Sequence, residues 1–337
     1  MSSKSVTLKD VAAAANVSRA TAARALNGYG YVGKEAAERV RVAAGKLGYR
    51  GNRIAQALRQ GELPLIAFVP GDILNPFFSQ IAHDLETELR AYQSNLIIAS
   101  NQEDVELEQQ VLTNILALNV KGIIVAPASN EKTPQLSKLI EDKYPLVVID
   151  RVPEGLLCDN ITVNNQQGAE EAVEFLIEHG HRRIAVIHDD SRIASTRDRL
   201  AGYRLALKNR SISFDETLVV ESKSTISHAI DATIRLFHQE NKPTAIFTTD
   251  SLMTKGALLA LRTLGVKIPH EVSIIGFDDF DMATFSDPQI TVLSQPVDKI
   301  GPLAIKMIME RIAGSQAPVK SIQFPTQLIV RGSVLNI

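Results

Sequence analysis

Residues 16–27 read Asn-Val-Ser-Arg-Ala-Thr-Ala-Ala-Arg-Ala-Leu-Asn, and the interpretation of the N-terminal part of the chain depends on them. Ser18 is a good helix N-cap directly before a helical run. Three apolar residues share one face of that run at helical spacing: Ala22, Ala25 and Leu26. The residues predicted to point elsewhere are Arg19, Ala23 and Arg24. The pattern predicts the second helix of a helix-turn-helix, and an ordinary helical hairpin on a core is the alternative.

Two further helices are predicted beside this one. The first spans about 8–15 and is expected to bury Leu8, Val11, Ala12 and Ala15. The link Asn16-Val17 is as short as a helix-turn-helix requires. The third runs from about Lys34 to Leu47, with Gly48 as its stop. Its expected buried residues are Ala36, Val40, Ala43, Ala44 and Leu47. Three short helices of this kind form a minimal DNA-binding headpiece.

The net charge of −2 conceals a strong asymmetry along the chain. Residues 1–60 hold 11 Lys and Arg against 3 Asp and Glu, whereas residues 61–337 hold 25 against 35. A small basic module on an acidic body is what binding to a phosphate backbone needs. A basic segment could also meet an anionic membrane, but its apolar faces are expected to be used in internal packing.

Length and composition limit the possible classes of protein. The chain has 337 residues, enough for two or three domains, with 45% hydrophobic and 22% charged residues. Its apolar runs are shorter than the ~18–20 residues of a membrane span, and its first residues do not resemble a signal peptide. The single cysteine, Cys158, is interpreted as a spare thiol in a reducing cytoplasm.

From Leu63 onward the sequence alternates between strands and helices. The predicted strands are 65–69, 96–100, 122–126, 146–150, 161–163, 184–188, 218–221, 245–249 and 273–277. Amphipathic helices are predicted at 78–92, 106–118, 167–179, 199–209, 227–240 and 252–264. Strands this apolar indicate parallel sheets covered by helices, and their number favours two α/β lobes. Ligands of such folds collect at the carboxyl ends of the strands. Polar residues follow several strands there, as in Asp150-Arg151, Thr249-Asp250 and Asp278-Asp279.

An ordered set of motifs resembles the LacI/GalR family of bacterial transcription regulators over essentially the whole chain. It includes 7–12 (Thr-Leu-Lys-Asp-Val-Ala), 75–78 (Asn-Pro-Phe-Phe), 199–203 (Arg-Leu-Ala-Gly-Tyr), 272–279 (Val-Ser-Ile-Ile-Gly-Phe-Asp-Asp) and 328–333 (Leu-Ile-Val-Arg-Gly-Ser). The resemblance implies a helix-turn-helix headpiece at 1–48, a hinge at 49–61 and a two-lobed effector core at 62–337, like periplasmic binding proteins. The expected N-lobe is about 62–162 with 293–324, and the C-lobe about 163–292 with 325–337.

The resemblance assigns DNA contacts to the headpiece. In such proteins the second helix enters the major groove, and Arg19, Ala20 and Arg24 stand at its reading positions. Arginine can pair with guanine through two hydrogen bonds, whereas alanine offers only an apolar contact. The other headpiece residues implied at the DNA interface are Thr7, Ser18, Thr21, Asn27 and Tyr49.

The basic segment 49–61 is either a plain linker or a segment that folds on its target. Family hinges form a short helix in the minor groove, with a leucine wedged between base pairs. The matching residues are Asn52, Arg53, Ala55 and Leu58. Gly51 and Gln56 replace a proline and an arginine common in the family, and the glycine raises the entropy lost when the hinge orders.

The core is implied to bind a small monosaccharide, a ribose-like pentose or a related hexose. The residues implied at the effector site are Asn75, Phe77, Phe78, Asp150, Arg151, Ser195, Arg199, Thr249, Asp278 and Gln295. Aromatic faces suit a pyranose, and Asp and Arg suit vicinal hydroxyls. Thr249 replaces a common asparagine, so the preferred sugar is expected to lack or reposition one hydroxyl.

Other functions are weighed against a sugar-released repressor. An enzyme is disfavoured, because no strand-linked His or second acid cluster completes a site with Asp278, Asp279 and Asp281. The sequence also shows no zinc spacing or phosphate loop, and no metal or cofactor is expected. A periplasmic sugar carrier would need a signal peptide in place of the basic headpiece. A corepressor-type regulator responding to a purine, nucleoside or phosphorylated metabolite stays open. A homodimer on a pseudo-palindromic double-stranded operator is expected, without membrane contact, because one headpiece reads half a palindrome and no heptad tail follows residue 333.

Overall fold

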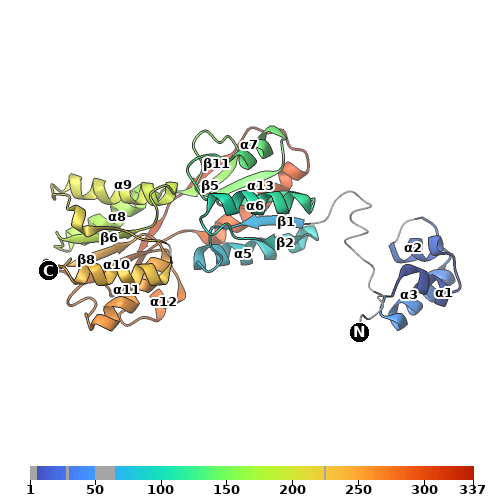
Figure 1. The fold of residues 1–337 in the computed structure, drawn as a ribbon, viewed down its shortest axis with the longest axis horizontal. Coiled ribbons are helices and arrows are strands. Elements are labelled where there is room, and N and C mark those ends of the chain that lie inside the picture. Colours follow the sequence, from blue (N-terminus) through green and yellow to red (C-terminus); the bar gives the residue numbers. More distant parts are fainter. Residues whose placement is uncertain (1–5, 28–29, 50–64, 224) are drawn as a thin grey trace. The chain divides into compact units, whose positions relative to one another are not determined.

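The computed structural model describes residues 6–27, 30–49, 65–223 and 225–337. The chain divides into two compact units, Met1–Leu63 and Pro64–Ile337. Figure 1 shows the first as a cluster of short helices and the second as two sheets with helices on both faces. Each unit is described by itself.

The described residues of the first unit form three helices, α1 (Leu8–Ala14), α2 (Arg19–Asn27) and α3 (Lys34–Leu47). Thr7 begins α1 through a capping box with Asp10, and the Ser18 hydroxyl accepts a hydrogen bond from the Thr21 amide at the start of α2. Asn16 turns the chain between the two helices at φ +52°, a conformation that asparagine tolerates. The three helices enclose a core of small residues: Val11, Ala12, Ala15, Ala22, Val40, Ala43 and Ala44.

Three details of the predicted headpiece core are wrong. Ala23 was expected to point away from the core, but it is buried. Leu47 is 38% exposed, because α3 ends there and Gly48 reverses the chain at φ +63°. The following residue, Tyr49, packs against the core in its place, with its amide bonded to the Ala44 carbonyl. Ala36, in the first turn of α3, is only half-buried.

The second unit contains two six-stranded sheets. The first sheet has the order β11-β5-β4-β3-β1-β2, and its registered pairs are all parallel. Its strands are β1 (Leu65–Val69), β2 (Asn95–Ile98), β3 (Gly122–Val125), β4 (Leu146–Asp150), β5 (Asp159–Val163) and β11 (Ser321–Phe324). We call this sheet and its helices the N-lobe. The helices are α5 (Pro76–Leu89), η1 (Arg90–Tyr92), α6 (Val105–Ala117), α7 (Pro134–Glu141) and α13 (Val297–Ile312).

The second sheet repeats this order as β12-β10-β9-β8-β6-β7, with β12 antiparallel to β10. Its strands are β6 (Ile184–His188), β7 (Val219–Glu221), β8 (Ala245–Thr248), β9 (Ser273–Phe277), β10 (Thr291–Ser294) and β12 (Gln327–Ile329). This sheet and its helices form the C-lobe. The helices are α8 (Asn165–Glu178), α9 (Ala194–Asn209), η2 (Glu216–Leu218), α10 (Ile226–Phe237), α11 (Ser251–Leu264) and α12 (Asp281–Phe285).

Each sheet is buried on both faces, as its continuous apolar strands predict. One face of the N-lobe sheet packs against α5 and α13, and the other against α6 and α7. The C-lobe sheet packs against α8 and α9 on one face and against α10 and α11 on the other. The prediction of two α/β lobes is confirmed, whereas β10, β11 and β12 were not predicted. Each of these strands has only three or four residues, and polar residues such as Thr291, Ser321 and Gln327 are among them. They therefore lack the long apolar run that marked the other strands.

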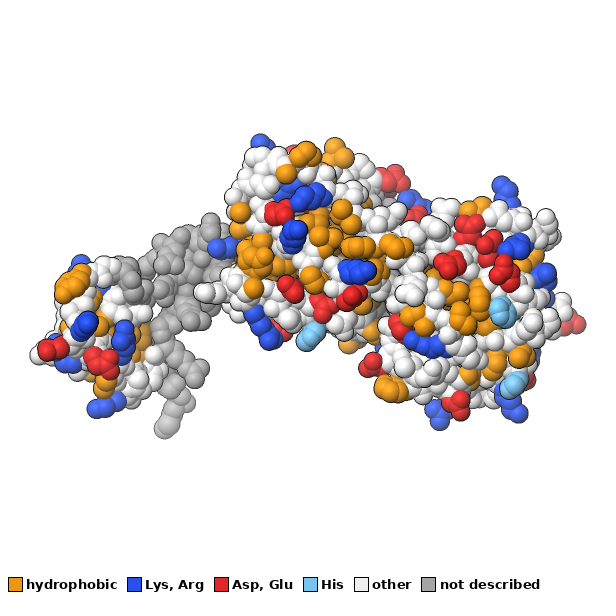
Figure 2. Space-filling view, turned by 180° about the vertical axis from the view of Figure 1, so that it is seen from behind, with side chains coloured by type: hydrophobic (Ala, Val, Ile, Leu, Met, Phe, Trp, Pro, Cys, Tyr) orange, Lys and Arg blue, Asp and Glu red, His pale blue; other side chains and the backbone are white. Residues whose placement is uncertain are grey.

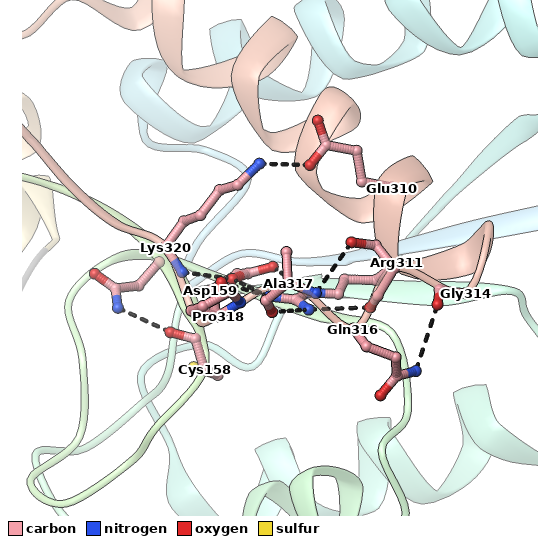
Figure 3. Close-up of polar contacts among 11 residues, drawn as sticks. Cys158, Asp159, Glu310, Arg311, Gly314, Gln316, Ala317, Pro318 and Lys320 are labelled. Carbon is pink, nitrogen blue, oxygen red and sulfur yellow. Dashed lines mark hydrogen bonds and ion pairs between the residues drawn. The ribbon is translucent and has the colours of Figure 1, made fainter.

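The chain passes between the lobes three times, after Val163, after Ser294 and between Phe324 and Gln327. The segment that links α13 to β11 is clamped by Arg311, which donates two hydrogen bonds to the Asp159 carboxylate and others to the carbonyls of Ala317 and Pro318 (Figure 3). Although burial opposes it, this bonding lowers the pKa of Asp159. The neighbouring thiol of Cys158 is buried, which raises its pKa to about 12 and keeps it in the unreactive protonated form.

Candidate functional site

A single cavity in the second unit is lined by all ten residues that the sequence assigned to the effector site. These residues come from both lobes. Four others line it as well: Glu103, Asp189, Thr196 and Asp250. Its empty volume is about 400 Å³, of which about 40 Å³ is open to the centres of water-sized molecules. A few waters or one compact polar ligand match a space of this size.

The cavity lies at the carboxyl ends of both sheets, where parallel strands present the residues that follow them. Asp150 ends β4 and Asp278 follows β9, and both adopt a left-handed conformation, at φ +68° and +71°. The two strands hold the same place in their sheets, the third from the edge formed by β11 or β12. Both lobes therefore present an aspartate from an equivalent position.

On the N-lobe side, Arg151 lies between two carboxylates. Its Nη2 is 2.5 Å from Glu103 Oε2, and its Nε is 3.6 Å from Asp150 Oδ2. Arg151 is only 5% exposed. Burial works against the charged guanidinium, but the two carboxylates outweigh it and raise the pKa of Arg151. Burial raises the pKa of Glu103, and the Arg151 charge offsets part of that rise.

The loop that carries Glu103 is held by a buried polar network. Gln102 and Glu103 both have positive φ, which turns the chain back toward the cavity after β2. The Glu103 amide donates to Asn101 Oδ1, and Asn101 Nδ2 donates to the Ala126 carbonyl. Glu108, completely buried beside them, accepts a hydrogen bond from the Ala128 amide at 2.7 Å. The position of Glu103 is thus fixed by its supporting residues.

On the C-lobe side, the guanidinium of Arg199 is bound by neutral partners. Its Nε donates to Asn165 Oδ1 at 2.8 Å and its Nη1 to the Thr249 carbonyl at 2.6 Å. The guanidinium carbon stands 3.5 Å from the centroid of the Phe277 ring, an attractive cation–π contact. The Thr249 hydroxyl donates weakly to the Met253 sulfur at 3.6 Å. Thr249 therefore contributes to the site through its carbonyl.

Asp278 and Asp189 are acidic groups of this side that form no ion pair with any of the described residues. Asp278 Oδ1 accepts a hydrogen bond from Gln295 Nε2 at 2.7 Å, and Asp189 Oδ1 accepts one from the Asp190 amide. Burial raises the pKa of Asp278 to about 6, although the Arg199 charge opposes the rise. Burial, reinforced by the charge of Asp250, raises the pKa of Asp189 to about 7.

The aromatic wall of the cavity belongs to α5. Phe77 and Phe78 are 6% and 3% exposed, and their rings meet edge to face at 5.0 Å between centroids. Both also belong to the N-lobe core, so they serve packing and cavity lining at once. Asn75 begins the helix by accepting a hydrogen bond from the Phe77 amide.

Hydrogen bonds close the cavity by joining the lobes. Ser251 Oγ donates to Asn75 Oδ1 at 3.0 Å, and Ser195 Oγ to Asp150 Oδ2 at 3.5 Å. Further out, the Asn130 amide donates to the Arg192 carbonyl, and Arg197 pairs with Glu154 at 3.2 Å. The two lobes are therefore in a closed arrangement.

The predicted effector site lacked three charged residues of the cavity: Glu103, Asp189 and Asp250, the last of which was noted only as a residue at a strand end. Asp189 directly follows β6, so the rule that selected Asp150 and Asp278 could have selected it as well. Glu103 lies five residues beyond β2 and reaches the cavity only through the left-handed turn, for which the sequence has no periodic signal.

The described candidates for DNA contact lie on α2, at the N-termini of α1 and α2, and just after α3. Arg19, Ala20 and Arg24 are exposed on α2. The hydroxyls of Thr7 and Ser18 serve as helix caps, and the Thr21 hydroxyl lies 2.9 Å from that of Ser18. Tyr49 is half-buried against the headpiece core. The side chain of Asn27 and all of Asn52, Arg53, Ala55 and Leu58 lie outside the described residues.

Two family descriptions match the chain. Residues 7–52 match the model of bacterial regulatory proteins of the lacI family, and residues 173–334 match a periplasmic binding protein-like domain. In the part of the chain that the structure describes, no helix is long and apolar enough to cross a bilayer. The residues of those same ranges bring together no group of three or more His, Cys, Asp or Glu suited to a metal ion.

Curated relatives match the chain nearly end to end. The ribose operon repressor of Haemophilus influenzae is 28% identical over 331 residues, which cover 98% of this chain and 99% of the relative. The transcriptional repressor PurR of Vibrio atlanticus is 27% identical, with 97% and 98% covered. The solved structure of the transcriptional regulator CelR in complex with cellobiose has a TM-score of 0.73 and 28% identity, with 97% and 99% covered.

A helix-turn-helix unit joined to a two-lobed core with a closed interlobe cavity defines a class, the ligand-binding transcriptional regulators that bind DNA. The matches to both parts and to full-length relatives make the particular assignment. The chain contains a lacI-family helix-turn-helix domain and a periplasmic binding protein-like domain, and its full-length relatives are DNA-binding transcriptional regulators of the LacI family.

Proposed function

We propose that this protein is a repressor that a small monosaccharide, a ribose-like pentose or a related hexose, releases from its operator. The observation that carries the proposal is the single cavity lined by all ten residues selected for a sugar site. It offers the mixture that sugars need, namely an aromatic wall on α5 with carboxylates and guanidiniums around it. The ribose operon repressor among the relatives supports the same effector class.

Operator binding is proposed to use the exposed residues of α2, with Arg19 and Arg24 reading base edges and Ala20 offering an apolar contact. Thr21, Asn27, Tyr49 and Asn52 are proposed to bind the phosphates, and Thr7 and Ser18 are proposed to lie at the same DNA interface. We assign the headpiece to 1–48, the hinge to 49–61 and the core to 62–337, with Leu58 of the hinge entering the minor groove. The basic excess of the first 60 residues supports this assignment.

A homodimer on a pseudo-palindromic operator in the cytoplasm is the proposed working form. The N-lobe exposes large apolar side chains, among them Leu74, Tyr92 and Ile98 at 76%, 45% and 44%. Figure 2 shows apolar side chains gathered on one face of this lobe. Exposed apolar surface of this kind suits contact with a second copy.

Fluorescence anisotropy on a labelled operator, selected from random sequence with the full-length protein, tests the proposal. We expect one or more pentoses or hexoses to weaken operator binding at least tenfold, because the sugar favours one arrangement of the lobes. Response only to a purine or nucleoside, or a strengthening of operator binding, would contradict it. The second candidate function is a corepressor-type regulator that responds to a purine, and the similarity to PurR is the observation that supports it.

A further inference from the structure

The C-lobe places three aspartates in a row along the cavity edge. Asp278, Asp250 and Asp189 follow β9, β8 and β6, which are neighbours in the sheet. Neighbouring strands lie about 4.8 Å apart, so the three residues leave the sheet at steps of that size. All three line the interlobe cavity.

The charges of the cavity do not balance. Among the described residues, its lining contains five carboxylates and two guanidiniums. Arg151 is matched by Glu103 and Asp150 on the N-lobe side. The remaining cation, Arg199, donates to Asn165 and to the Thr249 carbonyl and forms no ion pair with a described residue. Asp250 caps α11 by accepting a hydrogen bond from the Met253 amide, so the surplus negative charge of the C-lobe side rests on Asp189 and Asp278.

A buried acceptor in the same region has no partner. Gln295 is 94% buried and lines the cavity, and its Oε1 makes no hydrogen bond within the described residues. Its amide nitrogen is already committed to Asp278. The second carboxylate oxygens of Asp278 and Asp189 likewise accept no hydrogen bond from the residues described. A ligand on this side meets acceptors and needs donors.

An outer cavity leads to the same acidic residues. It shares Phe77, Asp278 and Gln295 with the inner cavity, and about 710 Å³ of it is open to the centres of water-sized molecules. Its lining adds the carboxylates of Asp84, Asp279, Asp281 and Asp298. Arg331 neutralises Asp279, and Lys255 is the cation that lines the cavity among the described residues. The approach to the inner cavity thus has a negative potential, which attracts cations.

Resting on the proposed function, we propose that the effector is a cationic amino sugar, a monosaccharide in which an ammonium group replaces one hydroxyl. The ammonium lies against the C-lobe aspartates and Gln295 Oε1, and the remaining hydroxyls lie toward Arg151, Asp150 and the ring of Phe77. A hydroxyl both donates and accepts, whereas an ammonium offers three donors and no acceptor. The unmatched groups of the C-lobe side are acceptors, so the ammonium is the better complement.

The Thr249 hydroxyl is directed to the Met253 sulfur, so this residue presents no amide group to a ligand.

Burial also couples the binding of a cation to the release of protons from the protein. It raises the pKa of Asp189 to about 7 and that of Asp278 to about 6, so part of these groups is protonated near neutral pH. The charged groups around them are Asp250, Glu103 and Arg151 for Asp189, and Arg199, Asp250 and Asp150 for Asp278. A cation favours the ionised carboxylates, so its binding releases protons, whereas a neutral sugar has no such requirement.

Isothermal titration calorimetry on the full-length protein tests the proposal with three matched pairs: glucosamine and glucose, galactosamine and galactose, mannosamine and mannose. Titrations at pH 7.0 in two buffers of different ionisation enthalpy measure the protons released. We expect one amino sugar to bind at least tenfold more tightly than its neutral parent and to release protons. An equal or tighter affinity for the parent, or binding without proton release, would overturn the inference.

The operator assay separates this inference from the proposed function. If neutral sugars weaken operator binding and amino sugars do not, the inference fails and the proposed function stands. If no member of either series binds but a pentose such as ribose weakens operator binding, the inference fails and the proposed function stands; if no pentose, hexose or amino sugar binds, both fail.

Two adjacent aspartates provide a matched pair of variants. Asp189→Asn is expected to reduce the preference for the amino sugar to threefold or less while the affinity for the neutral parent changes little. Asp190→Asn removes the neighbouring carboxylate, which pairs with Arg192 and does not line either cavity, and should leave the preference intact. An unchanged preference in Asp189→Asn, or an equal loss in both variants, would count against the assignment.

Discussion

The two lobes share one topology but differ in how they treat the same position. Each sheet ends its third strand from the β11 or β12 edge at a left-handed aspartate that lines the cavity, Asp150 in the N-lobe and Asp278 in the C-lobe. The next residue is Arg151 in the N-lobe and Asp279 in the C-lobe. The N-lobe aspartate therefore forms an ion pair with the next residue, whereas Asp279 pairs with Arg331, and Asp278 forms no ion pair with a described residue.

This difference separates two uses of a buried charge. In the N-lobe, Arg151 lies between Glu103 and Asp150 and offsets most of their charge, so this group contributes shape and fixed polarity to the cavity. In the C-lobe, Asp189 and Asp278 form no ion pair with a described residue, so their burial raises the free energy of the closed protein until a partner arrives. Variants of the two sides should consequently change stability in opposite directions.

The largest effect is expected at Arg151. Arg151→Met leaves Glu103 and Asp150 buried without a cation, which should lower the free energy of unfolding by about 3–5 kcal/mol. Urea denaturation measures it. Arg192→Met is the control, because that guanidinium is 82% exposed and pairs with Asp190 at the surface, where a pair is worth at most about 1 kcal/mol. Comparable losses in the two variants would remove the distinction between the lobes.

The substitution Asp189→Asn is expected to raise the free energy of unfolding, whereas Arg151→Met lowers it. The folded pKa of Asp189, about 7, lies above the unfolded value of 3.8, so the native state loses stability as the pH rises from about 4 to 7. Asp189→Asn should remove this loss and raise the free energy of unfolding at pH 8 by roughly 2 kcal/mol. Chemical denaturation across pH 4–8 provides the measurement.

The substitution Asp190→Asn is expected to change stability in the opposite direction to Asp189→Asn. Hydrogen bonds from Arg192 lower the pKa of Asp190, so its carboxylate stabilises the folded state above its unfolded pKa, and that contribution disappears as the pH falls. Removal of Asp190 should therefore lower stability at pH 8. A stabilising Asp190→Asn, or a destabilising Asp189→Asn, would refute the account of the C-lobe row.

A smaller effect is expected at Gly71. This residue has no side chain and so leaves room for Glu103 and Arg151. A Cβ at this position would stand 1.9 Å from Glu103 Oε1 and 3.0 Å from Arg151 Nη2. Gly71→Ala should displace Glu103 and lower the free energy of unfolding by about 1–3 kcal/mol. In a double-mutant cycle with Glu103→Ala, the loss from Gly71→Ala should largely vanish. Additive losses would show that the glycine serves another purpose.

The smallest effect is expected where the lobes meet. Ser251→Ala removes the hydrogen bond to Asn75 Oδ1, which still accepts one from the Phe77 amide, so no buried acceptor is left without a partner. The loss should be about 0.5–1 kcal/mol. Ser79→Ala, which removes hydrogen bonds within α5 only, is the control, and only Ser251→Ala should alter effector affinity in calorimetry. Equal effector affinities in the two variants would contradict a role for this bond in closure.

Periodicity and end signals predicted much of the fold. The predicted boundaries of β1, β4, β6, β9 and α3 agree with the structure, because long apolar runs and terminal glycines mark them. The short edge strands β11 and β12 were not predicted, since they have only four and three residues and contain the polar residues Ser321, Gln323 and Gln327. Leu47 was misplaced because helical spacing does not reveal that the chain turns back at Gly48.

The cavity could be predicted only in part, for a physical reason. Residues such as Asp150 and Asp278 follow strands, and parallel topology brings the ends of strands to one edge. Glu103 arrives from a loop whose path depends on the buried amide of Asn101 and on two left-handed residues. Such paths are set by tertiary hydrogen bonds, which leave no local pattern in the sequence.

The three crossings between the lobes make the core topologically indivisible. The N-lobe sheet is completed only by β11, which enters after the whole C-lobe sheet except β12 has been formed, and the Arg311 clamp fixes the linker that delivers it. A lobe therefore cannot be exchanged with that of a homologue through a single recombination point. Three matched junctions are needed, near residues 164, 295 and 325. Effector specificity in this protein should thus diversify by point substitution along the strand ends rather than by shuffling of lobes.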